Sequence, residues 1–234
     1  MKIRGRRECR DCGCRWSYYE TGSVACPDCE SLRSVGVDED RTLHTDAPAT
    51  LDLTPYRTAA ADDDLHAVVD DCKSDLRAYL RRRGFVDGGT LRPLDETVVA
   101  AAELLQVVDA FDRRRSPTDA EHTYLLALLR DADGGERPSP DAVPEELAAA
   151  RGLGDANAVD AYRRDLLEWL DDHPDGAARR TLGTLRERVK RVEALQGDVS
   201  PSAAEALVRA AREVGTYLAD GDDSALAAAR DRLG

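Results

Sequence analysis

The most constraining feature of this sequence is a pair of Cys-x-x-Cys motifs near its beginning. Cys9 and Cys12 form the first motif, Cys26 and Cys29 form the second, and thirteen residues separate them. Each motif places two thiolates on one tight turn, and two such turns can hold one tetrahedral metal ion. Gly13 suits the left-handed backbone that follows the first turn. We therefore predict a four-cysteine metal site, with zinc as the ion and iron as the alternative.

The segment around the motifs is too short to fold on hydrophobic burial alone. A chain of ~37 residues buries little apolar area, so metal binding would supply its folding free energy. We expect short strands within 3–8, 15–20, 24–25 and 32–37, with a turn at 21–23. Disulfide bonding is the alternative. The charged N-terminus lacks the apolar stretch of a secretory signal, which argues against an oxidising compartment.

Residues 1 to about 37 resemble a zinc ribbon, similar to that of transcription factor B and of archaeal RNA polymerase-associated ribbons. The whole arrangement resembles an uncharacterised haloarchaeal zinc-ribbon family with an acidic helical region. The resemblance implies a structural zinc ion and leaves the biological role open. Glu30 departs from the pattern because glycine is common there, and Cys14 adds a thiol near the site. The residues that carry the resemblance are Cys9, Cys12, Gly13, Cys26, Pro27 and Cys29.

Charge is distributed unevenly along the chain. The 234 residues include 33 Lys and Arg against 46 Asp and Glu, which gives a net charge of −13. Residues 1–36 are different, with seven basic and five acidic side chains. Lysine occurs only at positions 2, 73 and 190. Acidic, lysine-poor chains resemble the proteins of extreme halophiles, so we expect a halophilic, archaeal, cytoplasmic protein.

Two groups of side chains in the ribbon are candidate partner contacts. Its aromatic rings cannot all be buried in so small a hairpin, and they would offer a protein partner an apolar contact that persists in salt. Its arginines could contact nucleic acid or offset the negative charge of the metal site. Molar salt weakens phosphate contacts, so a protein is the favoured partner and nucleic acid the alternative. The aromatic candidates are Trp16, Tyr18 and Tyr19, and the basic candidates are Arg6, Arg7 and Arg10.

The remainder of the chain is predicted to be helical. Residues 38–56 are polar and contain Pro48 and Pro55, which indicates a linker or an extended strap across the next domain. From 57 to 234 apolar residues recur at helical spacing, and Cys72 is a core position of the first stripe. We therefore predict a mainly α fold, a small β ribbon at 1–37 followed by a bundle of roughly six helices. The stripes lie within 65–80, 98–111, 124–129, 162–170, 182–192 and 207–218.

Two helix starts carry capping signals. Thr118 and Glu121 form a candidate capping box after Ser116 and Pro117. Ser202 and Glu205 form a second candidate. The helices on either side of residues 196–201 are predicted to form an antiparallel hairpin.

No catalytic motif is present in the sequence, so we predict a non-enzymatic adaptor or regulatory protein. There is no His-Glu-x-x-His, phosphate loop or nucleophile elbow, and no apolar run long enough to span a membrane. Asp63 and Asp119 each precede a histidine, His66 and His122, by three residues, as in di-iron bundles. Such pairs arise by chance in so acidic a chain. A rubredoxin-like electron carrier and a direct nucleic-acid-binding protein are the alternative functions.

Overall fold

Short strands occupy the N-terminal part of the computed structural model, which describes residues 1–62, 65–113 and 117–234. They form a three-stranded sheet in the order β3-β2-β4 and a separate antiparallel pair, β1 with β5. The elements are β1 (Lys2–Ile3), β2 (Arg6–Cys9), β3 (Arg15–Ser17), the one-turn helix α1 (Tyr18–Thr21), β4 (Ser34–Gly36) and β5 (Thr42–Leu43).

Helices dominate the chain from residue 54 onward, and the mainly α fold class is confirmed. The predicted apolar stripes supply residues to one continuous core. A short hairpin of β6 (Val86–Asp87) and β7 (Thr90–Leu91) follows the helix that ends at Arg82. The helices are α2 (Thr54–Ala61), α3 (Val69–Arg82), α4 (Glu96–Asp112), α5 (Asp119–Asp131), α6 (Ala148–Trp169), α7 (Gly176–Ala194), α8 (Pro201–Asp220) and α9 (Asp223–Leu233).

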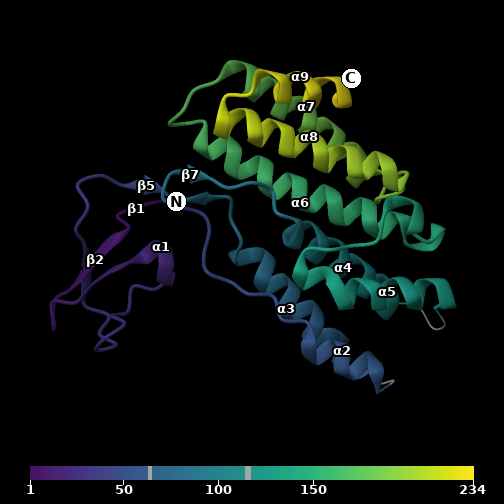
Figure 1. The fold of residues 1–234 in the computed structure, drawn as a ribbon, viewed down its shortest axis with the longest axis horizontal. Coiled ribbons are helices and arrows are strands. Elements are labelled where there is room, and N and C mark those ends of the chain that lie inside the picture. The colour runs from purple at the N-terminus through teal and green to yellow at the C-terminus, as the bar shows by residue number, and fades with distance from the viewer. Residues whose placement is uncertain (63–64, 114–116) are drawn as a thin grey trace.

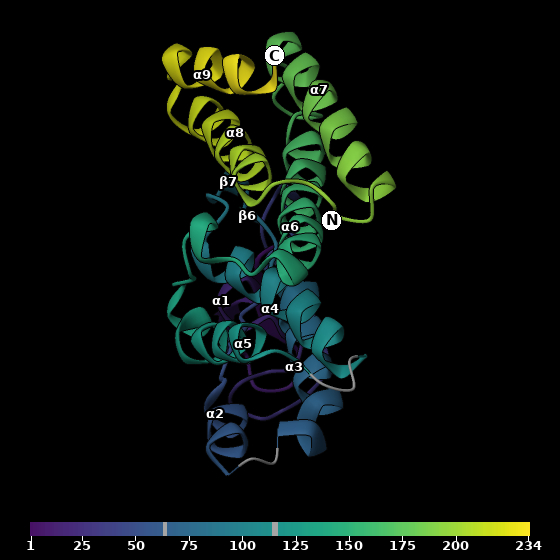
Figure 2. The same cartoon turned by 90° about the vertical axis from the view of Figure 1, so that its right-hand side faces the viewer.

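Helix α6 runs through the middle of the helical domain. Helices α2 to α5 lie on one side of it and α7 to α9 on the other, while the N-terminal strands and α1 lie beside the domain (Figures 1 and 2). Helices α2 and α9 were not predicted. Their apolar stripes are weak, because α2 buries only Tyr56, and α9 buries Leu226, Ala229 and Leu233.

The ribbon differs in detail from the predicted strand pattern. Strand β2 is the centre of the sheet, with Arg7 opposite both Trp16 of β3 and Gly36 of β4. The predicted strand 15–20 ends at Ser17, because the chain turns into α1 and Gly22 closes that helix with a φ of 62°. The expected strand at 24–25 is wrong, since the structure has no strand there.

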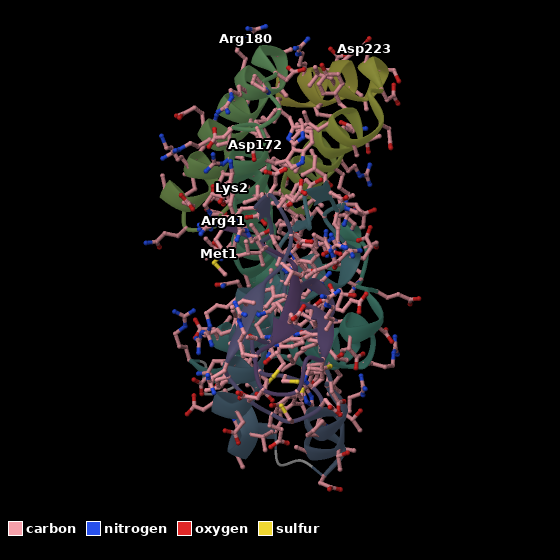
Figure 3. All side chains as sticks on the ribbon, turned by 90° about the vertical axis from the view of Figure 1, so that its left-hand side faces the viewer. Met1, Lys2, Arg41, Asp172, Arg180 and Asp223 are labelled. Atoms are coloured by element: carbon pink, nitrogen blue, oxygen red, sulfur yellow. The ribbon has the colours of Figure 1, made fainter. Side chains whose placement is uncertain are left out.

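Residues 42–53 connect the ribbon to the helical core. β5 pairs with β1, and further along Leu51 and Leu53 are buried in the core. Arg83 holds this segment through a bidentate ion pair with Asp46, at 3.0 and 2.9 Å. At the N-terminus, Lys2 Nζ lies 2.5 Å from an oxygen of Asp172, just beyond the end of α6 (Figure 3).

One predicted helix cap is confirmed and the other is wrong. Thr118 and Glu121 form a capping box at the start of α5, while Ser116 lies outside the described residues. Helix α8 begins earlier than predicted, with Ser200 as its N-cap and proline at its first position. Glu205 is therefore in the second turn of α8, where it is free to reach inward.

A buried network of charged side chains, which the sequence analysis missed, joins the helices around α6. Arg137 Nη1 lies 2.9 Å from Glu103 and 2.5 Å from Asp155, and its Nη2 lies 2.7 Å from Glu205. Arg151 pairs with Glu103 at 3.2 Å and with Glu205 at 3.1 Å. The members of this buried network are Glu103 on α4, Tyr124 on α5, Arg137 in the loop before α6, Arg151 and Asp155 on α6, and Glu205 on α8.

The buried network holds three carboxylates but only two guanidinium groups. Burial raises the pKa of Asp155 to about 6, and this effect outweighs the attraction of Arg137. Oδ2 of Asp155 has no hydrogen-bond partner among the described residues. The exposed Arg209 also lies 3.6 Å from Glu205 and adds a third guanidinium group at the edge of the network.

Replacing Asp155 with asparagine should remove a pH dependence of stability. The pKa of Asp155 is about 6 in the fold against an ordinary 3.8, so the folded state holds this proton more tightly than the unfolded chain does. The resulting stabilisation of the fold is fully present below pH 3.8 and is lost as the pH rises through 6. The difference in unfolding free energy, variant minus wild type, should rise over this range by on the order of 3 kcal/mol in urea titrations. Asp141→Asn, at an exposed turn, should show no such change. If the difference in unfolding free energy fell as the pH rose, ion pairing would lower the pKa of Asp155 more than burial raises it.

Candidate metal centre

The structure brings the four predicted cysteines into one cluster. Their Sγ atoms all lie within 4.8 Å of one another. The sulfurs of Cys9 and Cys29 are 3.6 Å apart, as are those of Cys12 and Cys26. A tetrahedral ion with metal–sulfur bonds of about 2.3 Å requires sulfur separations of about 3.8 Å. All six cysteines of the chain are free thiols, so this cluster is a candidate metal site.

Two matching backbone turns position these thiols. In the first turn Gly13 N donates to Cys9 O at 3.1 Å, and in the second Glu30 N donates to Cys26 O at 2.9 Å. The fifth residue of each turn is left-handed, with a φ of 76° at Gly13 and 59° at Glu30. The departure noted at Glu30 thus places a side chain where the backbone favours glycine.

The environment of the two buried thiols favours thiolates. Backbone N–H groups of Cys12 and Asp11 lower the pKa of Cys9. Burial raises the pKa of Cys26, but hydrogen bonds from the backbone N–H groups of Cys29 and Asp28 and from neighbouring thiols outweigh burial. The pKa is therefore lowered to about 7. Thiolates are the form that binds a metal ion, so these backbone donors favour the metal-binding form of Cys9 and Cys26. At Cys12 and Cys29 a backbone N–H lowers the pKa, but burial and neighbouring thiols raise it overall.

Asp11 links the two cysteine turns, a role that the sequence analysis did not predict. Its Oδ1 accepts from Arg33 Nη1 at 2.8 Å, and its Oδ2 accepts from Ser31 Oγ at 2.5 Å. Asp11 lies within the first motif, and the two donors follow the second. The signal was present in the sequence as an acidic residue inside Cys-x-x-Cys, but its partners are set by the fold.

Trp16 is not a surface contact, contrary to expectation. It is only 9% exposed and packs with Cys9, Cys14 and Cys26 in the small core of the ribbon. Its Nε1 donates to Ser23 O at 3.1 Å. The ring is buried because β3 pairs with β2 over the cysteine cluster, so the ring closes one side of the site.

Tyr18 and Tyr19 are half-buried where the ribbon meets the helical domain. The Tyr19 ring lies 4.7 Å from the buried His44 ring, and Tyr18 meets the same ring edge-on at 6.0 Å. A Cβ added at Gly5 or Gly88 would come within 3 Å of the Tyr19 ring, so the ring fills the space between them. Both tyrosines therefore contribute to packing within the chain.

The three candidate arginines differ in their contacts. Arg6 Nε lies 2.5 Å from Asp38 Oδ1, and Arg7 donates to Ser34 Oγ at 3.0 Å. The Arg10 side chain is exposed and has no protein partner among the described residues. Of these three arginines, Arg10 is therefore the one whose side chain has no partner in the described part of the chain.

No second metal cluster of His, Cys, Asp and Glu is found within the described ranges. His66 and His122 both stack on Phe111, at 4.8 and 6.3 Å, and Asp63 lies outside the described residues. Cys72 is 1% exposed, and burial raises its pKa to about 12, which agrees with its predicted place in the core.

Comparison with known proteins places the chain in one family. A model of a family of unknown function, DUF7117, matches residues 1–233. No curated protein and no solved structure matches the chain. Across the residues that the structure describes, we find no helix with both the length and the apolar character needed to cross a bilayer.

Substitutions at the two left-handed positions, Gly13 and Glu30, should change the affinity for the metal ion in opposite directions. Glu30→Gly should relieve backbone strain and bind the ion more tightly, by about 1 kcal/mol. Gly13→Ala should weaken binding by a similar amount, because an added Cβ meets nothing within 4 Å and only the backbone conformation is affected. Competition with a chromophoric chelator measures both effects. Shifts of the same sign would contradict this account.

Tyr19→Ala should loosen the ribbon from the helical domain. Removing a half-buried ring from between two glycines should cost about 2 kcal/mol. Amide exchange at His44, whose N–H donates to Met1 O at 3.0 Å, should then accelerate. Tyr19→Phe keeps the ring and should preserve protection. Unchanged exchange in the alanine variant would show that Tyr19 does not secure the ribbon.

Proposed function

The chain belongs to the DUF7117 family, and we propose that it is a zinc-binding, non-enzymatic adaptor or regulatory protein. The observation that supports this most is the four-thiol cluster on two matching turns, with sulfurs 3.6 Å apart in two pairs. Four protein ligands fill a tetrahedral site, so the ion has no open position for a substrate. Its role in this proposal is to organise the ribbon.

Zinc suits that role better than iron. The separate core of the ribbon contains only Trp16, Cys9, Cys26 and the adjoining Cys14. So small a core needs an ion for its stability, and a redox-inactive ion supplies this without side reactions. Iron on the same thiolates would instead make the ribbon an electron carrier, since Cys12 and Cys29 are exposed.

Three exposed apolar side chains of the ribbon are the proposed contact with a protein partner. Val24, Leu32 and Val37 are 43%, 74% and 40% exposed, and they lie close to the cysteine turns in sequence. These residues replace the aromatic rings as the proposed contact, because apolar contacts persist in salt. Arg10, exposed and unpaired within the described residues, lies on the first turn and can supply a polar contact at the rim.

Direct nucleic-acid binding is the less favoured function. Arg6 is paired with Asp38 and Arg7 with Ser34, so phosphate contacts would have to displace existing partners. The ribbon's resemblance to that of transcription factor B makes a component of the transcription or translation machinery the first partner to test. We propose a cytoplasmic, halophilic, archaeal setting because the acidic, lysine-poor composition resembles that of proteins from extreme halophiles.

Metal analysis is the first test. The untagged protein, purified in molar KCl, should contain one zinc per chain by plasma mass spectrometry and be colourless. Bound iron with thiolate charge-transfer bands would overturn the proposal in favour of an electron carrier.

Partner recovery is the second test. The Leu32→Asp variant should no longer recover the partner proteins that the full-length wild type recovers. The Leu195→Asp variant, altered at another leucine that is 45% exposed, should still recover them. A partner identified in this way, once purified, should bind the Leu32 variant at least about tenfold more weakly. Zinc content should be equal in all three proteins. Equal binding to both variants would show that the ribbon is not the contact surface.

A further inference from the structure

A hollow of about 430 Å³ is lined by residues of the C-terminal part of α3 and by residues of α4 and α6, and none of the four clustered cysteines lines it. Figure 1 shows where these three helices lie in the fold. We propose that the hollow binds a small organic anion, in which a phosphate or carboxylate group is attached to an apolar body. The site is separate from the ribbon and does not depend on the proposed adaptor function. We call this cavity the arginine hollow. Its charged lining residues are Arg77, Arg81, Arg83, Arg164 and the single acidic residue Asp165.

Two of these arginines have no partner within the described residues. Arg77 and Arg81 are exposed, and they lie one turn apart on α3, where like charges oppose each other. Other arginines, among them Arg186 and Arg191 on α7, also lack a partner within the described residues, but Arg77 and Arg81 lie one turn apart and line the same hollow. An anion between the two guanidinium groups would remove their repulsion.

The other charged groups of the hollow are held in place. Arg83 pairs with Asp46 and Asp95, each at 2.9 Å, and Arg164 Nε pairs with Asp160 at 3.1 Å. Asp165 faces the same hollow, but its Oδ2 already accepts from Thr45 Oγ1 at 2.5 Å and from Phe85 N at 2.7 Å. Burial also raises the pKa of Asp165, which weakens its repulsion of an anion.

The lining also includes an apolar portion. Leu80 and Leu105 are partly buried and contribute to the hollow together with Phe85 and Ala161. An inorganic anion would leave these groups uncovered, whereas an organic anion would bury them while its charged group met the arginines. The mixed lining therefore selects a molecule with both parts.

Two simpler explanations account for less of this arrangement. The negative end of the α3 dipole favours Arg81 in its last turn, but Arg77 lies a turn earlier and Arg164 comes from α6. A long polyanion would need unpaired charge beyond the hollow. In the neighbouring hollow between α6 and α7, Arg163 is paired with Asp160 and Lys190 with Glu187. Arg186 is the one cation of that lining without a partner among the described residues, so that hollow lacks two adjacent unpaired guanidinium groups.

Calorimetric titration of the full-length, metal-loaded protein with phenyl phosphate tests the proposal. Phenyl phosphate should bind more tightly than inorganic phosphate or phenol, and benzoate in its place distinguishes a carboxylate from a phosphate head group. Arg77→Gln/Arg81→Gln should weaken binding by at least about tenfold. Arg164→Gln provides a second variant on a different helix and should also weaken binding.

The matched control is Arg41→Gln/Arg191→Gln, which removes two exposed arginines that have no partner within the described residues and lie outside the hollow (Figure 3 labels Arg41). This control has the same net charge as the α3 double variant and should bind phenyl phosphate like wild type. Equal weakening in both double variants would overturn the proposal, as would an absence of binding at millimolar probe. Preferential binding of polyuridylate that displaces phenyl phosphate would instead identify a nucleic-acid surface.

Discussion

The helical domain depends on two arginines buried among three carboxylates. Arg137 and Arg151 bind Glu103, Asp155 and Glu205, so α4, α6 and α8 share one set of charges. Removing one partner from a buried ion pair leaves an uncompensated charge, which costs about 3–5 kcal/mol. The network therefore fixes which helices meet around α6 and at what register.

Close packing makes this network possible. A Cβ at Gly154 would come within 2.6 Å of the Glu103 backbone, so only glycine allows α6 to approach α4 this closely. Once the helices are close, Glu103 is fully buried and must find a cation within reach. Arg137 supplies it from the loop before α6, which draws that loop onto the core.

The ribbon depends on the thiol cluster in a similar way. Its turns bring Cys9 and Cys26 under Trp16, while Tyr19 and the β1–β5 pair attach it to the helical domain. The aromatic residues are thus occupied within the chain, whereas the apolar side chains of Val24 and Leu32 are exposed. This division follows from size, because so small a sheet can bury one large ring but not three.

The sequence by itself determined the features that depend on short-range spacing. Two Cys-x-x-Cys motifs predict clustered thiols, and the 3–4 spacing of apolar residues predicts the main helices, because these relations span only a few bonds or one helical turn. Glu103 lies within the apolar run of α4, but the sequence analysis did not use this signal and it does not identify the partners of the carboxylate. The network, the position of Tyr19 and the arginine hollow were decided only by tertiary structure. They join residues distant in the chain, and local spacing carries no information about which helices pack together.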